Sequence, residues 1–287
     1  MTRLIFGCGY LGQRVGQRWI ERGERPVAVT RSAQRAEELA RLGFQPLVAD
    51  VTRPETLHHL PAAETVVYAV AYGRANSLSR TEVQVAGLRA ALDALRQPPR
   101  RLVYISSTSV YGDCHGGWVD EDTPCQPDRE QGRVALAAEE TLRSHPVGSS
   151  AVVLRLAGMY GRGRIPSLGD LAAGRPLAVA ADAVVNLIHV DDAAAIVLAA
   201  AEQADPPTLL LVSDGHPVLR REFYRCLSQW LRLPPPTFLE PEPAELASRR
   251  GFGSKRVRNA RMLQALGAPL RYPTYREGLA AVAQARS

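Results

Sequence analysis

The chain has 287 residues, of which 46% are hydrophobic and 22% charged, a composition typical of a globular protein with a large apolar core. Its formal net charge is +6, but Lys255 is the only lysine and the arginines are interleaved with acids, which favours a solvated basic surface over a nucleic-acid site. No apolar run is long enough to span a bilayer and no export signal is recognisable, so we expect a cytoplasmic protein with no membrane partner.

Short apolar segments alternate with amphipathic ones up to about residue 156. We predict strands over residues 2–6, 26–30, 46–49, 65–70, 101–106 and 151–156. The helices expected between them cover residues 11–22, 33–42, a short stretch after Pro54, 76–96 and 132–143. Strands without polar alternation are typical of a parallel sheet covered on both faces. The order predicts an α/β fold with a Rossmann-type doubly wound parallel sheet.

Beyond residue 161 the alternation gives way to loops rich in glycine and proline. The later elements expected are a strand at 208–212 and helices at 191–203, 219–231, 259–266 and 275–285. We therefore predict a dinucleotide-binding domain over 1–160. Residues 161–287 are expected to form a smaller C-terminal region that covers the substrate, with some elements returning to the main domain.

The four cysteines are Cys8, Cys114, Cys125 and Cys226. They are widely spaced and form neither a Cys-x-x-Cys pair nor a cluster with histidine. We expect reduced thiols and no metal site.

A glycine-rich turn follows the first predicted strand and opens the first predicted helix. Its sequence is Gly7-Cys8-Gly9-Tyr10-Leu11-Gly12, which matches G-x-G-x-x-G. In such a turn the first glycine permits the sharp bend, the second lets the backbone approach a pyrophosphate and the third lets helix and strand pack closely. We predict that Gly7, Gly9, Tyr10, Leu11 and Gly12 bind a nicotinamide dinucleotide; the alternative is a chance match in a structural turn.

The end of the second predicted strand bears on cofactor choice. The sequence there is Thr30-Arg31-Ser32, without the acid that would bind a ribose 2′-hydroxyl in an NAD-selective protein. An arginine at this point accommodates a 2′-phosphate, so Arg31, with Ser32 and Arg35, favours NADP over NAD. The alternative is that Arg31 is a solvated residue at the start of the next helix.

Three further motifs carry a family resemblance. They are Tyr104-Ile105-Ser106-Ser107-Thr108-Ser109-Val110-Tyr111-Gly112-Asp113, Leu154-Arg155-Leu156-Ala157-Gly158-Met159-Tyr160-Gly161 and Ile188-His189-Val190-Asp191-Asp192. With the glycine turn, they resemble the extended short-chain dehydrogenase/reductase superfamily, in its NAD-dependent epimerase/dehydratase group. Residues 255–261 and 272–279 resemble the YeeZ-type branch of bacteria, an atypical subgroup.

Further cofactor contacts are expected from residues at or just beyond predicted strand ends. Asp50 is a candidate for the adenine amino group, although a helix-capping aspartate is an alternative. The other residues expected to contact the cofactor are Val51, Ala69, Ala71, Ala157 and Gly158.

The resemblance also implies a catalytic serine at Ser107, which hydrogen-bonds the reacting oxygen in active members, with a Tyr-x-x-x-Lys pair on the next helix. In that pair the lysine charge lowers the pKa of the tyrosine. Here Gln131 stands in place of the tyrosine and Ala135 in place of the lysine. The usual acid/base route is therefore missing, and the alternative for Ser107 is a structural serine at a strand end.

Residues near the ends of predicted strands are candidates to replace the missing acid/base pair or to bind the substrate. Tyr72 and Tyr160 follow predicted strands and are candidate catalytic groups. Arg162 and Arg164 could hold a phosphate or carboxylate of a substrate, the alternative being exposed loop charges. The remaining candidate substrate residues are Ser109 and Asn186.

Two hypotheses from different classes follow. The first is an NADP-linked oxidoreductase or epimerase-like enzyme that acts on a small polar metabolite, phosphorylated or nucleotide-linked. The second is a catalytically inactive protein that senses NADP(H) or serves as a scaffold. The resemblance further implies a homodimer that pairs through the helices expected at 76–96 and 132–143.

Overall fold

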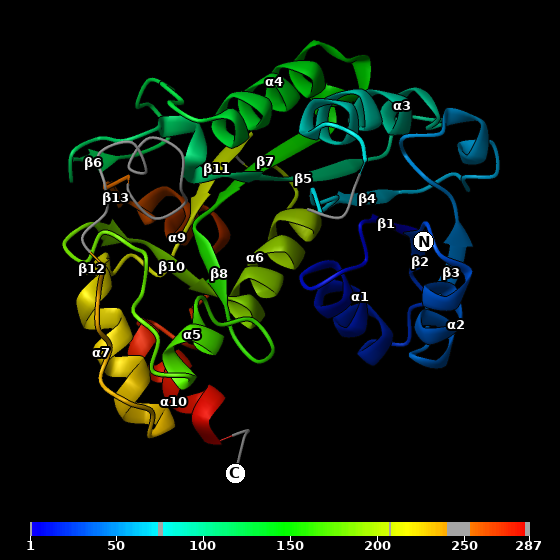
Figure 1. Ribbon diagram of the computed structural model, residues 1–287. Coiled ribbons are helices and arrows are strands. Elements are labelled where there is room, and N and C mark those ends of the chain that lie inside the picture. Colours follow the sequence, from blue (N-terminus) through cyan, green and yellow to red (C-terminus); the bar gives the residue numbers. More distant parts are fainter. Residues whose placement is uncertain (1, 74–76, 207, 240–252, 285–287) are drawn as a thin grey trace. The chain divides into compact units, whose positions relative to one another are not determined.

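The computed structural model describes residues 2–73, 77–206, 208–239 and 253–284 (Figure 1). Its main sheet has seven strands in the order β11-β7-β5-β4-β1-β2-β3. The pairs β1–β2, β1–β4, β2–β3 and β4–β5 are parallel. The strands are β1 (Arg3–Phe6), β2 (Val27–Thr30), β3 (Gln45–Val48), β4 (Thr65–Tyr68), β5 (Arg101–Ser107), β7 (Ala151–Leu156) and β11 (Leu209–Val212). This order confirms the predicted Rossmann-type fold.

Helices cover both faces of the sheet. Figure 1 shows α3 and α4 on one face and α1 and α2 on the other. The helices that connect its strands are α1 (Gly12–Glu21), α2 (Ala33–Arg41), the 3₁₀ helix η1 (Pro54–Leu57), the π-helical turn η2 (Glu82–Ala86), α3 (Gly87–Asp93), α4 (Glu130–Ser144), the 3₁₀ helix η4 (Pro146–Ser150) and α6 (Val190–Glu202). Strands enclosed in this way must be apolar, and Thr65–Tyr68 is buried throughout.

The helix predicted over 76–96 is shorter than expected. Residue 76 lies outside the described residues, and the described helical stretch runs over residues 80–93. Its start is fixed by a capping box, in which the Ser79 amide donates to Glu82 (2.7 Å) and the Glu82 amide donates to the Ser79 hydroxyl (3.2 Å). Pro98 and Pro99 follow its end and cannot continue a helix.

The remaining elements are mostly short. The 3₁₀ helix η3 and helices α5, α7, α9 and α10 cover Thr108–Tyr111, Leu168–Ala172, Arg220–Leu231, Ala260–Leu266 and Tyr275–Gln284. The small strands are β6 (Trp118–Val119), β8 (Gly158–Tyr160), β9 (Val184–Val185), β10 (Leu187–His189), β12 (Val218–Leu219) and β13 (Arg256–Val257). Strands β8–β10 and β6–β13 pair in parallel and β9–β12 antiparallel. Such two- and three-residue strands have no periodicity that could predict them. The predicted helix end at 285 lies outside the described residues.

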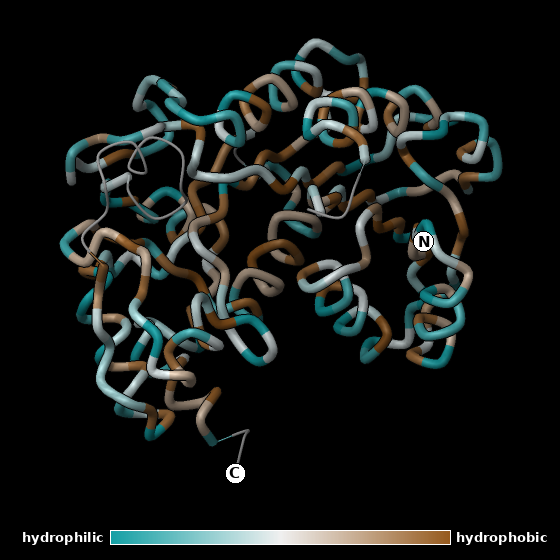
Figure 2. Tube along the Cα trace, viewed as in Figure 1, coloured by the Kyte–Doolittle hydropathy of each residue, from teal (hydrophilic) through white to brown (hydrophobic). Residues whose placement is uncertain are grey.

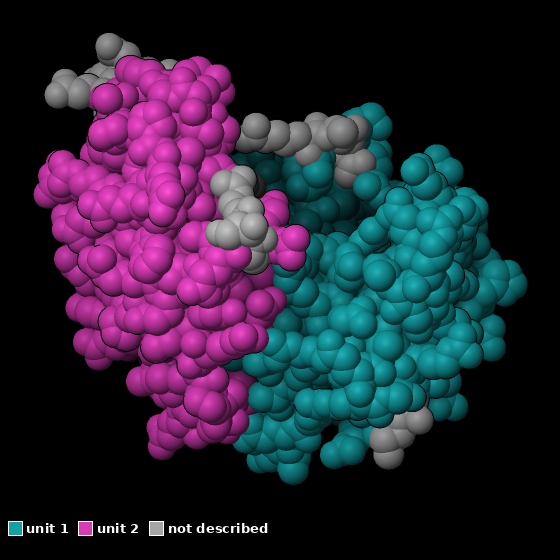
Figure 3. Space-filling view, turned by 90° about the horizontal axis from the view of Figure 1, so that it is seen from below, with its two compact units in different colours: residues 1–107, 130–155, 194–210 teal, residues 108–129, 156–193, 211–287 magenta. Residues whose placement is uncertain are grey.

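The chain forms two compact units, coloured separately in Figure 3. Unit 1 comprises 1–107, 130–155 and 194–210, and unit 2 comprises 108–129, 156–193 and 211–287. The predicted division at residue 160 stays a prediction.

Each unit has its own apolar core. In unit 1 the core includes Leu4, Phe6, Val66 and Leu102 from the sheet; in unit 2 it includes residues such as Phe223 and Leu279. Figure 2 shows the corresponding pattern along α1 and α2, where brown apolar and teal polar residues alternate.

Two further observations concern membranes and metals. Within the described ranges, no helix is both long and apolar enough to cross a membrane. All four cysteines are free. No group of three His, Cys, Asp or Glu side chains suited to a metal ion occurs in the part of the chain that the structure describes.

Candidate functional site

The glycine turn joins β1 to α1, and its three glycines differ in their surroundings. Gly7 has a φ of +80°, and a Cβ there would lie 2.5 Å from the Ala69 carbonyl oxygen. A Cβ on Gly12 would lie 2.6 Å from the Gly7 carbonyl oxygen, so packing requires both glycines. At Gly9, no described atom beyond the chain neighbours lies within 4 Å of such a Cβ. The backbone at Gly9 is therefore open to the close approach of a ligand.

Helix α1 begins directly after this turn without a side-chain cap. Leu11, at the N-cap, makes no side-chain hydrogen bond to the helix and is itself buried. The described first turn contains no acidic residue. The ring of Tyr10 stacks on the Arg14 guanidinium at 4.2 Å. The helix start thus keeps the positive dipole end that attracts a phosphate, which fits a dinucleotide pyrophosphate.

Arg35, on α2, forms hydrogen bonds to the glycine turn and to the start of α1. Its guanidinium donates to the Cys8 carbonyl oxygen (3.4 Å), to Gln13 Oε1 (2.8 Å) and to the Glu38 carboxylate (2.6 Å). The contacts to Cys8 and Gln13 join α2 to both sides of the turn. Arg35 was predicted to help bind a 2′-phosphate, and in this structure its guanidinium contacts these three protein groups.

Ser32 and Arg31 lie between β2 and α2. The Ser32 hydroxyl caps α2 by accepting the Arg35 amide hydrogen (3.3 Å). Arg31 follows β2 directly and its side chain is exposed. Of the three residues predicted to bind a 2′-phosphate, Arg31 is therefore the one that presents a cation at the exposed end of the strand.

The other predicted cofactor residues of unit 1 follow β3 and β4. Asp50 Oδ1 accepts from the Thr52 amide (2.9 Å) and hydroxyl (2.8 Å), so one carboxylate oxygen shapes the loop after β3. Val51 is buried, Ala69 is half-buried against Gly7 and Ala71 is exposed. Their contacts to a cofactor stay predictions.

Ser107 ends β5 and is half-buried, next to a network that the sequence did not indicate. The Ser106 hydroxyl donates to Glu139 Oε1 at 2.5 Å. Arg155 Nε donates to Glu139 Oε1 (3.0 Å) and Arg155 Nη2 to Oε2 (2.6 Å). Because the Glu139 and Arg155 side chains are only 1% and 5% exposed, this ion pair locks α4 to the ends of β5 and β7.

Helix α4 carries the two positions where acid/base residues are missing. Gln131 and Ala135 are both half-buried. Tyr72, a predicted replacement, donates its hydroxyl hydrogen to the Leu78 carbonyl oxygen (3.0 Å), and Arg80 stacks on its ring at 4.4 Å. These contacts fix the Tyr72 ring, and its catalytic role stays a prediction.

Tyr160, the other predicted replacement, lies in the core of unit 2. It is 1% exposed, and its ring meets those of His189 (5.3 Å) and Phe223 (6.4 Å) edge-on. Among the described residues, neither its hydroxyl nor Asp214 Oδ2 has a hydrogen-bond partner. Burial raises the pKa of Tyr160, and the Asp214 charge raises it further. This placement favours a packing role over proton transfer.

Asn186 was predicted to bind substrate, and both ends of its amide contact the backbone around β13. Its Nδ2 donates to the Lys255 carbonyl oxygen and its Oδ1 accepts from the Val257 amide, both at 2.8 Å. The contacts position the segment that carries Lys255. Ser109 lies in η3 and is half-buried.

The remaining predicted residues of unit 2 lie on or near β8. Gly158 is exposed, and the Ala157 amide donates to the Val212 carbonyl oxygen (2.9 Å). Arg162 and Arg164 are exposed in a tight turn closed by two backbone hydrogen bonds between Gly161 and Arg164 (3.1 and 3.0 Å). Their binding roles stay predictions.

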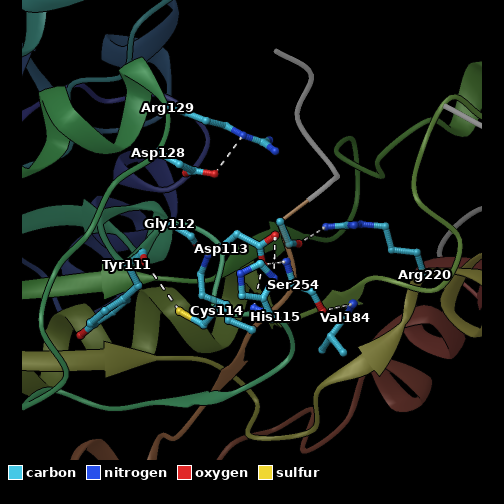
Figure 4. A network of polar contacts seen from close by, with 12 residues as sticks. Tyr111, Gly112, Asp113, Cys114, His115, Asp128, Arg129, Val184, Arg220 and Ser254 are labelled. Atoms are coloured by element: carbon cyan, nitrogen blue, oxygen red, sulfur yellow. Dashed lines mark hydrogen bonds and ion pairs between the residues drawn. The ribbon is translucent and has the colours of Figure 1, made fainter. Parts of the chain in front are cut away.

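A cluster of charges in unit 2 was not predicted from the sequence. Lys255 Nζ donates to the Gly112 carbonyl oxygen at 2.7 Å, and Asp113 Oδ1 accepts from the Ser254 amide at 2.9 Å. Figure 4 shows Arg220 reaching toward this segment, where it donates to the Gly253 carbonyl oxygen (3.4 Å). The one available signal was that Lys255 is the only lysine of the chain.

Residues 4–212 match the family described as the NAD dependent epimerase/dehydratase family. The Escherichia coli K12 protein YeeZ is 31% identical to this chain over 280 residues, which cover 94% of this chain and 95% of YeeZ. This similarity agrees with the resemblance found in the C-terminal motifs.

Two solved structures extend the comparison. One, from Methylobacillus flagellatus and assigned to the NAD-dependent epimerases/dehydratases, is 34% identical with a TM-score of 0.80, and covers 99% of this chain and 98% of its own. The protein MoeE5, solved with UDP-glucose and NAD, is 22% identical with a TM-score of 0.79 and covers 99% and 98%. At that identity, MoeE5 shares the fold.

Proposed function

The chain belongs to the NAD-dependent epimerase/dehydratase family, and from that premise we propose that it is an NADP-linked oxidoreductase or epimerase-like enzyme. Its substrate is a small polar metabolite, nucleotide-linked or phosphorylated. MoeE5, which shares the fold, was solved with UDP-glucose and NAD, and this supports the substrate class.

The open backbone at Gly9 is the observation that carries the cofactor proposal. Gly7 and Gly12 are required by contacts within the protein, whereas Gly9 has no such contact among the described atoms. A glycine without a packing reason, at the second position of a G-x-G-x-x-G turn between a strand and a helix, fits a pyrophosphate that needs its backbone. The uncapped start of α1 supplies amides and a positive dipole end for the pyrophosphate.

The proposed preference for NADP rests on Arg31. The residue is exposed at the end of β2, where an NAD-selective protein carries an acid. Because Ser32 caps α2 and Arg35 braces the glycine turn, Arg31 is the cation best placed for a 2′-phosphate.

The bound cofactor supplies hydride-transfer chemistry at its nicotinamide ring. In this proposal Gly9 and α1 hold the pyrophosphate, and Ser107 donates a hydrogen bond to the reacting oxygen of the substrate. The Glu139–Arg155 pair keeps the end of β5 in position.

A second candidate function is a protein that binds NADP(H) and signals its redox state without catalysis. The observation in its favour is that Gln131 and Ala135 replace the acid/base pair of the resembling family, since neither side chain exchanges a proton near neutral pH. Turnover of hydride with any polar carbonyl substrate would reject this candidate.

We also propose that the protein forms a homodimer through α3 and α4. The family resemblance implies pairing through these two helices. Both helices lie on the same face of the sheet (Figure 1), so they can form one continuous surface. Sedimentation of the wild-type protein at several concentrations tests this, and a monomer at micromolar concentration contradicts it.

The cofactor proposal is tested by calorimetric titration of NADPH and NADH into wild type, Arg31→Asp and Arg25→Asp. Arg25 is exposed at the opposite end of β2, so its substitution is a matched charge reversal. We expect NADPH to bind wild type at least tenfold more tightly than NADH. Arg31→Asp removes this preference and Arg25→Asp keeps it. Equal effects of the two substitutions, or no binding of either nucleotide, reject the proposal.

A further inference from the structure

Arg80 is the first residue of the helical stretch that follows β4, and the capping box of Ser79 and Glu82 fixes where this stretch begins. A cation in the first turn of a helix opposes the helix dipole, because the N-terminal end of the dipole is positive. The Arg80 side chain is nevertheless only 17% exposed. Helix stability therefore gives no reason for a basic residue at this position.

The contacts of Arg80 hold its guanidinium in place without neutralising it. The guanidinium stacks on the Tyr72 ring at 4.4 Å, and Nη1 donates to Gln84 Oε1 at the long distance of 3.4 Å. Among the described residues, the acid that comes within ion-pair distance is Glu130, whose Oε2 lies 4.0 Å from Arg80 Nε. This distance is too long for a hydrogen bond, and the Glu130 side chain is 67% exposed, so the ion pair is weak.

Part of the Arg80 guanidinium is buried without a hydrogen-bond partner. Arg80 Nε is buried, and no group in the described ranges accepts its hydrogen. A guanidinium has five N–H donors. A partly buried cation with one long hydrogen bond is costly to keep, and such a group is suited to a ligand that brings acceptor oxygens.

The backbone next to Arg80 is irregular. Residues Glu82–Ala86 form the π-helical turn η2, and this turn carries Gln84, the residue that accepts from Arg80. Single π-helical turns are rare, and they occur frequently at functional sites. The turn is therefore a second, independent indication of a functional site around Arg80.

Arg80 lies at the edge of the sheet where ligands bind in open α/β folds. Tyr72, on which it stacks, follows the carboxyl end of β4, and the neighbouring strand β5 ends at Ser107. Glu130 directly precedes Gln131, the position where the tyrosine of the acid/base pair is missing. All of these residues belong to unit 1.

We propose that Arg80 binds an anionic oxygen group of the substrate, of the kind that a carboxylate or a phosphoryl group presents. The proposal rests on the function proposed above and requires its substrate to carry a negative charge. The planar fork of a guanidinium donates to two oxygens of such a group at once, and stacking on Tyr72 fixes the plane of the fork. Glu130, the nearest acid, competes weakly with the ligand.

Chemical modification of arginines measures occupancy at Arg80. The wild-type protein is treated with phenylglyoxal, which reacts with guanidinium groups, and mass spectrometry of peptides gives the rates at Arg80 and Arg89. Arg89 is exposed on α3 and is the internal control. Phosphate, acetate and chloride are added separately, at tens of millimolar and constant ionic strength. We expect phosphate or acetate to slow modification of Arg80 at least threefold relative to chloride and to leave Arg89 unchanged.

Substitution of Glu130 separates this site from a general charge effect. Glu130→Gln removes the competing carboxylate and should lower the anion concentration for half-protection of Arg80 at least twofold. Glu140→Gln, on the same helix and from an exposed pair with Arg143, should leave this concentration unchanged. Both glutamates are exposed, so neither substitution should unfold the protein.

The Tyr72 ring gives a second pair of variants. Tyr72→Leu removes the stacked ring and should raise the concentration for half-protection at least threefold. Tyr72→Phe keeps the ring and loses the hydroxyl that donates to the Leu78 carbonyl oxygen, so it should change this concentration less than twofold. Circular dichroism verifies that both variants are folded.

The outcomes are distinct from those of the cofactor test. Arg31→Asp should weaken NADPH binding and leave the protection of Arg80 intact, so one proposal can fail while the other stands. Protection by phosphate alone or by acetate alone supports the site and identifies the group as phosphoryl or carboxylate. Equal rates at Arg80 in all three salts, equal protection of Arg89, or equal effects of Glu130→Gln and Glu140→Gln would overturn the proposal.

Discussion

The glycine turn of unit 1 and the Lys255 cluster of unit 2 are built in opposite ways. The turn consists of six consecutive residues, and its open position, Gly9, presents backbone. The cluster consists of side chains from distant segments, with Gly112 and Lys255 separated by 143 positions. A site made of local backbone can be altered without unfolding the protein. A site made of distant side chains depends on the packing that brings them together.

The same distinction applies to stability. Buried side-chain networks that join distant segments, such as Ser106–Glu139–Arg155, should contribute most to the free energy of unfolding. Local signals, such as a helix cap, should contribute little. The following changes test this ranking from the largest expected effect on stability to the smallest.

Glu139→Gln should have the largest effect. It removes the charge that pairs with buried Arg155 and leaves the guanidinium without its bidentate partner. We expect the free energy of unfolding to fall by about 3–5 kcal/mol in urea denaturation. The control is Glu140→Gln, whose exposed pair with Arg143 should be worth about 0–1 kcal/mol. Equal losses in the two variants would contradict the ranking.

Asp214→Asn should change how stability depends on pH. Burial raises the pKa of Asp214 to about 7, against the ordinary value of 3.8, although a hydrogen bond from the His216 amide opposes the shift. Folded protein therefore keeps this proton between pH 4 and 7, where unfolded chain has lost it. Stability falls as pH rises through this window, because the carboxylate must ionise in a buried site.

The size of the Asp214 effect can be measured against a matched variant. From pH 5 to pH 8 we expect the free energy of unfolding of wild type to fall by on the order of 3 kcal/mol more than that of Asp214→Asn. Asparagine keeps an acceptor for the His216 amide. Asp170→Asn, which removes a carboxylate from an exposed pair with Arg175, is the matched control. Parallel curves for wild type and Asp214→Asn would show that the group does not titrate in this range.

The strands of the main sheet and most of its helices could be predicted because each has a local pattern. The strand at 65–68 has no polar alternation and is buried throughout, and α1 follows a recognisable turn. The helix start at residue 80 was also encoded locally, by Ser79 and Glu82. Our predicted start, at residue 76, was too early. Ser-x-x-Glu should have indicated a capping box there.

Contacts between distant segments could not be predicted in the same way. The pairing of β6 with β13 involves two residues on each side, and nothing in either segment identifies the other. The same holds for Gly112 and Lys255, which share no sequence motif. For Asn186, the strand-end position suggested substrate binding, whereas its amide contacts the backbone of 255 and 257.

Ser79→Ala tests a local signal and should have a small effect on stability. It removes the hydroxyl that accepts the Glu82 amide hydrogen at the start of the helix. We expect a loss of about 1 kcal/mol in urea denaturation. Ser77→Ala, which lies outside the helix, is the control and should change little. A fall of more than about 3 kcal/mol in the free energy of unfolding would make this cap as important as the buried long-range networks. That result would contradict the proposed difference between local and long-range contacts.

Gly9→Ala tests the central claim most directly, since we assign the need for glycine at this position to a ligand, and a Cβ there would meet no described atom of the protein within 4 Å. The measurement is a calorimetric titration of NADPH into wild type and Gly9→Ala, with the melting temperature of each recorded without nucleotide. We predict that NADPH affinity falls at least tenfold while the two melting temperatures agree within about 2 °C, which corresponds to about 1 kcal/mol for a chain of this size. Unchanged NADPH affinity in Gly9→Ala would contradict the account, because the open backbone of the turn would then serve no nucleotide.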